Sequence, residues 1–183
     1  MSGRLRPPVT RKDHVAGPDD APLTLVEYGD YECPYCRAAH PIVQALRGRL
    51  GDRLRFAFRH FPLTQIHPYA ERAAEVAEAA GEHGEFWEMH DMLYEHQEEG
   101  LDDSHLLRYA AALGLDADEV AGDLDAGAYT DAVRADFMSG VRSGVNGTPT
   151  FFVNGERYDG PWQTEEELLR GVLESAESAA AGP

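Results

Sequence analysis

The two cysteines of this 183-residue chain stand two residues apart, in Cys33-Pro34-Tyr35-Cys36. A disulfide between them would close a very small loop, so it would constrain the unfolded chain little and would be a weak structural cross-link. Two thiols at this spacing suit reversible chemistry better, because one thiolate can attack a disulfide and the second thiol can resolve the mixed disulfide. We therefore predict a redox-active pair.

The segments on both sides of this pair predict a strand, a loop, a helix and a second strand. Leu23–Tyr28 is a β-favouring run. Pro34 suits the first position of a helix, and apolar residues then recur at helical spacing as far as Leu50. Leu54–Arg59 alternates as a strand, which completes a βαβ unit with a parallel strand pair. Cys33 would then precede a helix N-terminus, where backbone N–H groups and the helix dipole stabilise a thiolate.

A long block after the second strand is expected to be helical. Alanines recur along one face of residues 67–80. Asp102 or Asp103 can cap one further helix, and Asp116 can cap another. Strand character returns at Thr150–Val153, where Asn154-Gly155 predicts a type I′ turn. The expected order is βαβ, a helical insertion, then ββα.

The predicted fold class is α/β, with one core interrupted by an all-helical subdomain. The core comprises residues 13–62 and 143–177, and the helical insertion comprises residues 63–142. Residues 1–12 are expected to form a flexible arm, and the small-residue tail 178–183 is expected to fray.

Two motifs together resemble the DsbA-like branch of the thioredoxin family. They are Tyr28–Cys36, which reads YGDYECPYC, and Val145–Gly155, which reads VNGTPTFFVNG. The resemblance implies a thioredoxin fold with a helical domain inserted before the strand that carries a cis-proline. On this resemblance Pro149 is that proline, its bond to Thr148 faces the C-x-x-C, and Thr148 tunes the thiol. X-Pro bonds are otherwise trans by default.

The resemblance also assigns roles in substrate binding and proton transfer. Pro149 has no N–H, so the backbone beside it is left to pair with an extended substrate peptide. Thioredoxin-like proteins often hold a buried acid six residues before the first cysteine, the position of Glu27, and this acid could exchange a proton with Cys36. The alternative for Glu27 is a carboxylate at a strand end that points to water.

Two residues next to the reactive sulfur predict a protein that is less oxidising than DsbA. Glu32 places negative charge beside Cys33, and Tyr35 is neutral where DsbA itself has a histidine. Both residues disfavour the thiolate. We expect a reduction potential between roughly −120 mV, the value for DsbA, and roughly −270 mV, the value for thioredoxin.

These residues predict a thiol–disulfide oxidoreductase that exchanges with cysteines of protein substrates through a mixed disulfide at Cys33. A glutathione-linked, glutaredoxin-type reductase is the alternative, because glutaredoxins also contain a C-P-Y-C motif. A compact glutaredoxin, however, has no room for the helical insertion. A zinc site that uses His40, a chance pair of buried cysteines and a chaperone-like module are weaker alternatives. No second C-x-x-C or H-x-x-H completes a metal site. We expect no metal and no cofactor.

Charge and hydropathy restrict the partners. The formal net charge of −17 argues against a nucleic-acid partner, and no stretch approaches the roughly 20 apolar residues of a membrane span. The basic, proline-bearing start of the chain is not followed by an apolar run, so no signal peptide is expected. This favours a cytoplasmic location with the thioredoxin or glutathione system as redox partner. An exported form oxidised by a membrane oxidase stays open, and so does the direction of exchange.

Overall fold

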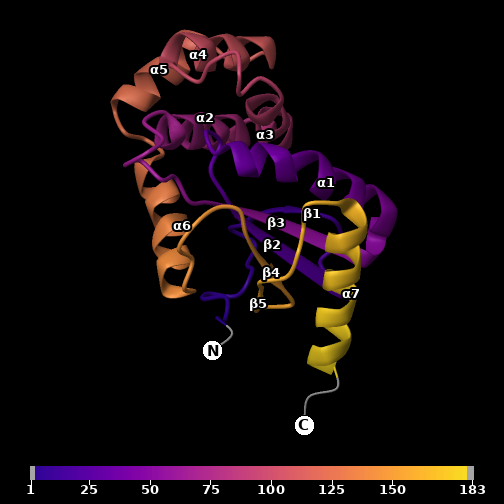
Figure 1. Cartoon of the computed structure of the whole chain (residues 1–183). Helices are drawn as coiled ribbons and strands as arrows, with labels where there is room; N and C mark the ends of the chain where they lie inside the picture. The colour runs from indigo at the N-terminus through magenta and orange to yellow at the C-terminus, as the bar shows by residue number, and fades with distance from the viewer. Residues whose placement is uncertain (1–2, 181–183) are drawn as a thin grey trace. The chain divides into compact units, whose positions relative to one another are not determined.

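The computed structural model describes residues 3–180, which form one five-stranded sheet and seven α-helices (Figure 1). In chain order the elements are β1 (His14–Ala16), β2 (Leu23–Gly29), α1 (Pro34–Leu50), a 3-10 turn (Gly51–Arg53), β3 (Leu54–His60), α2 (Ala70–Glu82), α3 (Phe86–Glu95), α4 (Asp103–Ala112), α5 (Ala117–Asp125), α6 (Thr130–Arg142), β4 (Thr150–Val153), β5 (Glu156–Tyr158) and α7 (Glu165–Ala180). The predicted fold class and element order are confirmed, and β1 is an additional edge strand.

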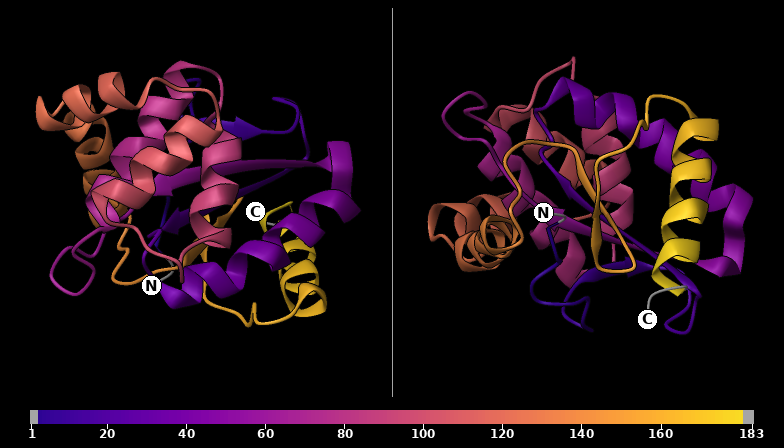
Figure 2. Two further views of the ribbon diagram at one scale, coloured as in Figure 1. Left: turned by 90° about the horizontal axis from the view of Figure 1, so that it is seen from above. Right: turned by 60° about the horizontal axis from the view of Figure 1, so that its bottom comes forward.

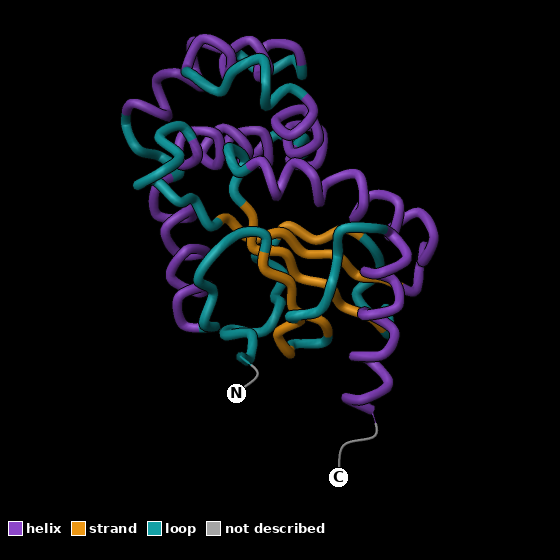
Figure 3. Tube along the Cα trace, viewed as in Figure 1, coloured by secondary structure: helices purple, strands orange, loops and turns teal. Residues whose placement is uncertain are grey.

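The sheet, whose strands are orange in Figure 3, has the strand order β1-β3-β2-β4-β5. β1 is antiparallel to β3, and β4 is antiparallel to both β2 and β5. β2 and β3 are neighbours joined by α1, the crossover that a parallel pair requires. Asn154 and Gly155 have φ angles of 48° and 85°, and two positive φ values in succession are what a type I′ turn needs.

The chain divides into two compact units. The sheet unit comprises, in its described part, residues 3–29, 38–59 and 139–180, and the helical unit comprises residues 30–37 and 60–138. The division differs from the expected one chiefly at residues 30–37. This segment contains both cysteines and belongs to the helical unit, although the sequence pattern suggested the core.

Helices cover one face of the sheet within the sheet unit. α7 packs against β2, β4 and β5, and Arg47 of α1 lies over the ring of Phe56 in β3. Arg49 of α1 forms ion pairs with Glu165 and Glu166 at the start of α7. α7 begins with a capping box, because Glu167 N donates to Thr164 Oγ1 and Thr164 N donates to the Glu167 carboxylate.

The opposite face of the sheet carries a buried arginine. Side chains alternate along a strand, so Arg59 and Phe56 point to opposite faces. The guanidinium of Arg59 donates to both carboxylate oxygens of Asp13, at 2.6 and 3.2 Å, and to the hydroxyl of Tyr28 at 2.9 Å. It also donates to the carbonyls of Pro7 and Pro8. We call this arrangement the Arg59 hub.

The Arg59 hub and the β4–β5 hairpin hold the N-terminal segment, which was expected to be a flexible arm. Leu5 is buried, and its N–H donates to the carbonyl of Gly155. Arg4 pairs with Glu156 as an isolated β-bridge and as an ion pair. From residue 3 onward this segment is therefore packed on the sheet. At the other terminus α7 continues to Ala180, and residues 181–183 of the expected tail lie outside the described residues.

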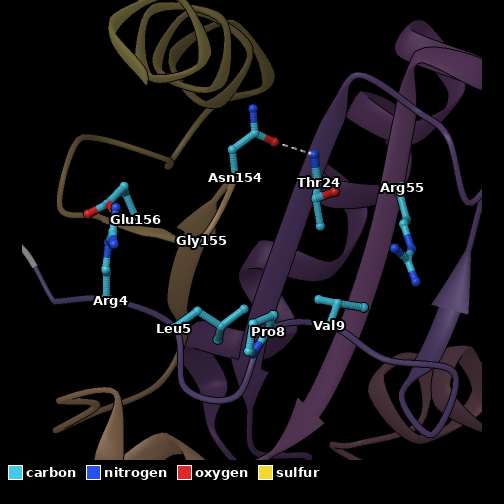
Figure 4. A pocket seen from close by; sticks show the side chains of 9 residues that line it. All are labelled: Arg4, Leu5, Pro8, Val9, Thr24, Arg55, Asn154, Gly155 and Glu156. Atoms are coloured by element: carbon cyan, nitrogen blue, oxygen red, sulfur yellow. Dashed lines mark hydrogen bonds and ion pairs between the residues drawn. The ribbon is translucent and has the colours of Figure 1, made fainter. Parts of the chain in front are cut away.

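A cavity of about 420 Å³ lies between the N-terminal segment and the hairpin (Figure 4). Asn154 Oδ1 accepts a hydrogen bond from Thr24 N at its rim. All nine lining residues belong to the sheet unit, and none of them was a predicted site residue.

The helical unit contains α2 to α5, which form one cluster in every view (Figures 1 and 2). The alanine face of α2 is buried as predicted. Asp102 and Asp116 cap α4 and α5 by accepting hydrogen bonds from backbone N–H groups. The cap at Asp116 is confirmed, and Asp102 rather than Asp103 is the cap of α4. None of the described helices is long and apolar enough to cross a membrane.

Candidate active site

The two cysteines lie at the start of α1. Cys33 immediately precedes the helix and Cys36 lies in its first turn. Both are buried, with 3% of Cys33 and none of Cys36 exposed. Pro34 is exposed between them, and so is Tyr35, with 66% of its surface accessible. The tetrapeptide thus presents two apolar residues to solvent and keeps both sulfurs just beneath them.

A buried carboxylate organises the segment before Cys33. One oxygen of Asp30 accepts a hydrogen bond from Glu32 N at 2.8 Å. The other oxygen accepts from Leu63 N at 2.9 Å and is bonded to His67 Nδ1 at 2.8 Å. The carbonyl of Asp30 accepts from Cys33 N at 3.1 Å. We call this arrangement the Asp30 hub, and it ties the redox segment to the loop between β3 and α2.

Side chains of the segment between Asp30 and Cys33 make further contacts within the helical unit. The hydroxyl of Tyr31 is bonded to His90 Nδ1 at 3.0 Å. The carboxylate of Glu32 accepts from Tyr69 N at 2.7 Å, just before α2. The carboxylate of Glu32, which was expected to disfavour the Cys33 thiolate, therefore also accepts a hydrogen bond from the backbone.

The turn after α3 contacts both sides of the tetrapeptide. The side-chain amide of Gln97 donates to the carbonyl of Tyr31 at 2.6 Å and to the carbonyl of Cys33 at 3.1 Å. The adjacent Glu98 forms an ion pair with Arg37. Sequence reasoning missed both Gln97 and Asp30. Only the Asp-x-x-Cys spacing, which suits a turn, could have drawn attention to Asp30.

The other predicted site residues belong to the sheet unit. Glu27 is 2% exposed and lies opposite Phe151 in the strand register, so it does not point to water. The Thr148–Pro149 peptide bond is cis. Pro149 is followed directly by β4, whose first residue, Thr150, lies opposite Tyr28 near the end of β2.

The structure thus brings Cys33, Pro34, Tyr35 and Cys36 together with Asp30 and Gln97 in one compact unit. Thr148, Pro149 and Glu27 lie in the other unit. Thiols at a helix N-terminus, with backbone donors and an adjacent second thiol, can carry out thiol–disulfide exchange.

Comparison with known proteins identifies the family and the fold. The family model described as thioredoxin matches residues 9–173. The chain belongs to the thioredoxin family. Within that family its fold is that of the DsbA-type oxidoreductases.

Two solved structures show the likeness in fold. BdbD from Bacillus subtilis matches with a TM-score of 0.82 at 23% identity, over 97% of this chain and 98% of that one. Alpha-DsbA1 from Wolbachia pipientis matches with a TM-score of 0.78 at 18% identity, over 94% of each chain.

The curated relatives of this chain are longer proteins that are named as antiporters. The protein named Na(+)/H(+) antiporter NhaA 3 of Salinispora tropica is 48% identical over 174 residues, which are 94% of this chain and 26% of that protein. This thioredoxin-family chain therefore spans about a quarter of the length of the curated relatives it matches.

Proposed function

We propose that this chain is a thiol–disulfide oxidoreductase that exchanges the Cys33–Cys36 dithiol and disulfide with cysteines of protein substrates. The observation that carries the proposal is the pair of cysteines at the start of α1, with Cys33 before the helix and Cys36 within its first turn. Family membership and the DsbA-type fold support the same chemistry.

In the reducing direction, the Cys33 thiolate attacks one sulfur of a substrate disulfide. A bond forms between Cys33 Sγ and that sulfur, and the second substrate sulfur leaves as a thiolate. Cys36, once deprotonated, then attacks Cys33 Sγ, which releases the first substrate sulfur and closes the Cys33–Cys36 disulfide. Two electrons pass to the substrate and two protons leave the dithiol. The reverse sequence oxidises a substrate dithiol.

The remaining residues have supporting roles in this proposal. Pro34 and Tyr35, both exposed, form the surface that a substrate meets first. Glu27, a buried carboxyl, exchanges a proton with Cys36. Thr148 tunes the thiol, and Pro149 leaves the neighbouring backbone to pair with an extended substrate.

The direction of exchange depends on the partner. We propose a cytoplasmic location in which the thioredoxin or glutathione system keeps the pair reduced. In an exported form, a membrane oxidase would take that place. Acid trapping of the thiols in cells, followed by alkylation, distinguishes the two cases, since a resident reductase is recovered as a dithiol.

A redox titration of the Cys33–Cys36 pair tests the proposal together with insulin reduction and the refolding of a scrambled disulfide protein. We expect a potential between roughly −120 and −270 mV. Cys33→Ser should abolish exchange, and Cys36→Ser should accumulate the mixed disulfide. Full exchange by Cys33→Ser would contradict the mechanism. Activity of Cys36→Ser that requires glutathione would instead indicate a glutaredoxin-type reductase.

A further inference from the structure

We propose that Gln97 is a positioning residue for Cys33, and that its side-chain amide favours the thiolate of that residue. This inference deepens the proposed exchange reaction and rests on Cys33 being its attacking group. Gln97 carries no charge and lies 64 residues along the chain from Cys33, so no sequence motif includes it.

The geometry makes one amide group responsible for two backbone carbonyls. Gln97 Nε2 donates to the carbonyl of Tyr31 at 2.6 Å and to the carbonyl of Cys33 at 3.1 Å. The Cys33 carbonyl also accepts from Arg37 N at 3.1 Å, in the first backbone hydrogen bond of α1. The amide therefore fixes the chain on both sides of Glu32 and orients the residue that bears the sulfur.

The same hydrogen bonds affect the charge that the sulfur can hold. A carbonyl oxygen bears partial negative charge, and the carbonyl of Cys33 belongs to the same residue as the sulfur. The partial positive charge of the Gln97 amide hydrogens offsets the two carbonyl oxygens, and this favours a thiolate. The carboxylates of Asp30 and Glu32 act in the opposite direction, so the amide donor counteracts negative charge in its own neighbourhood.

The residue after Gln97 extends this role to the far end of the tetrapeptide. Glu98 forms an ion pair with Arg37, which directly follows Cys36. Residues 97 and 98 thus hold the chain before and after the two cysteines. The Asp30 hub holds the same segment through the loop between β3 and α2, so the redox segment is anchored at several points of the helical unit.

The pH dependence of Cys33 alkylation tests the inference. In the full chain with Cys36→Ser, iodoacetamide reports the Cys33 thiolate alone. Gln97→Met keeps the side-chain length and removes both donors. It should slow alkylation at pH 6 about three- to tenfold and move the midpoint of the pH profile upward. Gln44→Met, at a half-buried position further along α1, is the matched control and should leave the profile unchanged.

Gln97→Glu provides a second, nearly isosteric variant. At neutral pH its carboxylate would face two carbonyl oxygens, so alkylation should be slower than in Gln97→Met. Below about pH 5 the protonated acid can donate again, and the deficit relative to the unsubstituted protein should shrink. This partial recovery at acid pH would tie the deficit to the hydrogen bond that the side chain at position 97 donates.

An unchanged alkylation profile in Gln97→Met or Gln97→Glu, with or without a lower melting temperature, would overturn the inference. If Gln97→Met does not fold, the profile of Gln97→Glu decides. Alkylation needs no exchange partner. A protein that shows the predicted profiles but exchanges no disulfide would therefore refute the proposed function and leave the role of Gln97 standing.

Discussion

The two units of the chain differ most in their charge. The segments of the helical unit, residues 30–37 and 60–138, hold 21 of the 33 acidic residues and four of the 16 basic residues, a formal net charge of −17. The remaining segments hold 12 of each sign and are neutral overall. The charge of the whole chain is therefore the charge of the unit that contains the redox tetrapeptide.

The two hubs show the same contrast on a smaller scale. The Arg59 hub in the sheet unit gathers oxygen acceptors around a buried cation and fixes the N-terminal segment. The Asp30 hub in the helical unit gathers N–H donors around a buried carboxylate and fixes the segment before Cys33. We infer that the first hub serves mainly the stability of the fold and the second mainly the site.

The largest expected effect comes from breaking the Arg59 hub. Arg59→Met leaves the carboxylate of Asp13, itself 7% exposed, without its cation. The free energy of unfolding should fall by about 3–5 kcal/mol in urea titrations. Exchange activity per folded molecule should change little. Arg55→Met is the matched control from the same strand. Its salt bridge partner Asp19 is largely exposed, so the loss should be within about 1 kcal/mol.

Breaking the Asp30 hub should lower exchange activity strongly and stability less. Asp30→Asn replaces an acceptor oxygen by an amide donor that faces backbone N–H groups. We expect kcat/KM for disulfide exchange to fall about tenfold or more, with a loss of about 1–3 kcal/mol in stability. The exposed Asp52→Asn is the control and should alter neither quantity. Undiminished kcat/KM in Asp30→Asn would remove the distinction between the two hubs.

The charge of the helical unit should select among substrates. Matched disulfide peptides flanked by lysines should react about tenfold faster than peptides flanked by glutamates at low ionic strength, because the acidic unit attracts cations to Cys33. The difference should nearly vanish at about 1 M salt, where screening shortens to a few ångström. Stopped-flow rates at several salt concentrations measure it. Equal rates for the two peptides at low salt would show that the charge of the helical unit does not affect the reaction at Cys33.

The smallest effect is a pH dependence of stability that arises in the helical unit. Burial alone would lower the pKa of His60. The hydrogen bond to Glu78 and the charges of Glu78 and Asp136 outweigh burial and raise this pKa above its usual value. A raised folded-state pKa stabilises the fold fully below the unfolded value of about 6.5, and this contribution is lost as pH rises through the folded value.

The variant His60→Gln isolates this contribution. The difference in unfolding free energy between the unsubstituted protein and His60→Gln should be largest near pH 6 and should shrink toward pH 9. Urea titrations across that range measure it. A difference that stays constant with pH would show that His60 folds in its neutral form.

Local signals made much of the fold predictable. The helix from Pro34, the alanine face of α2, the caps at Asp102 and Asp116 and the Asn154-Gly155 turn depend on residues close together in sequence, and all were found. The packed N-terminal segment was missed because its partners, Arg59 and Gly155, lie far along the chain.

In the candidate site, too, local features were predictable and contacts between distant residues were not. The C-x-x-C motif and its helix were predictable from spacing. The contacts of Asp30 with Leu63 and of Gln97 with Cys33 join residues more than 30 positions apart, so periodicity and composition contain no trace of them. For the same reason the sequence pattern assigned residues 30–37 to the core, whereas contacts place them in the helical unit.

The turn formed by Gln97 and Glu98 bears on how such a site can be transplanted. The tetrapeptide Cys33–Cys36 is only four residues long, yet the carbonyl of Cys33 and the neighbouring residues Tyr31 and Arg37 are held by side chains from the turn after α3. A graft of the tetrapeptide alone onto another helix would leave those anchors behind. A graft that takes residues 30–37 together with the turn after α3 would keep these contacts.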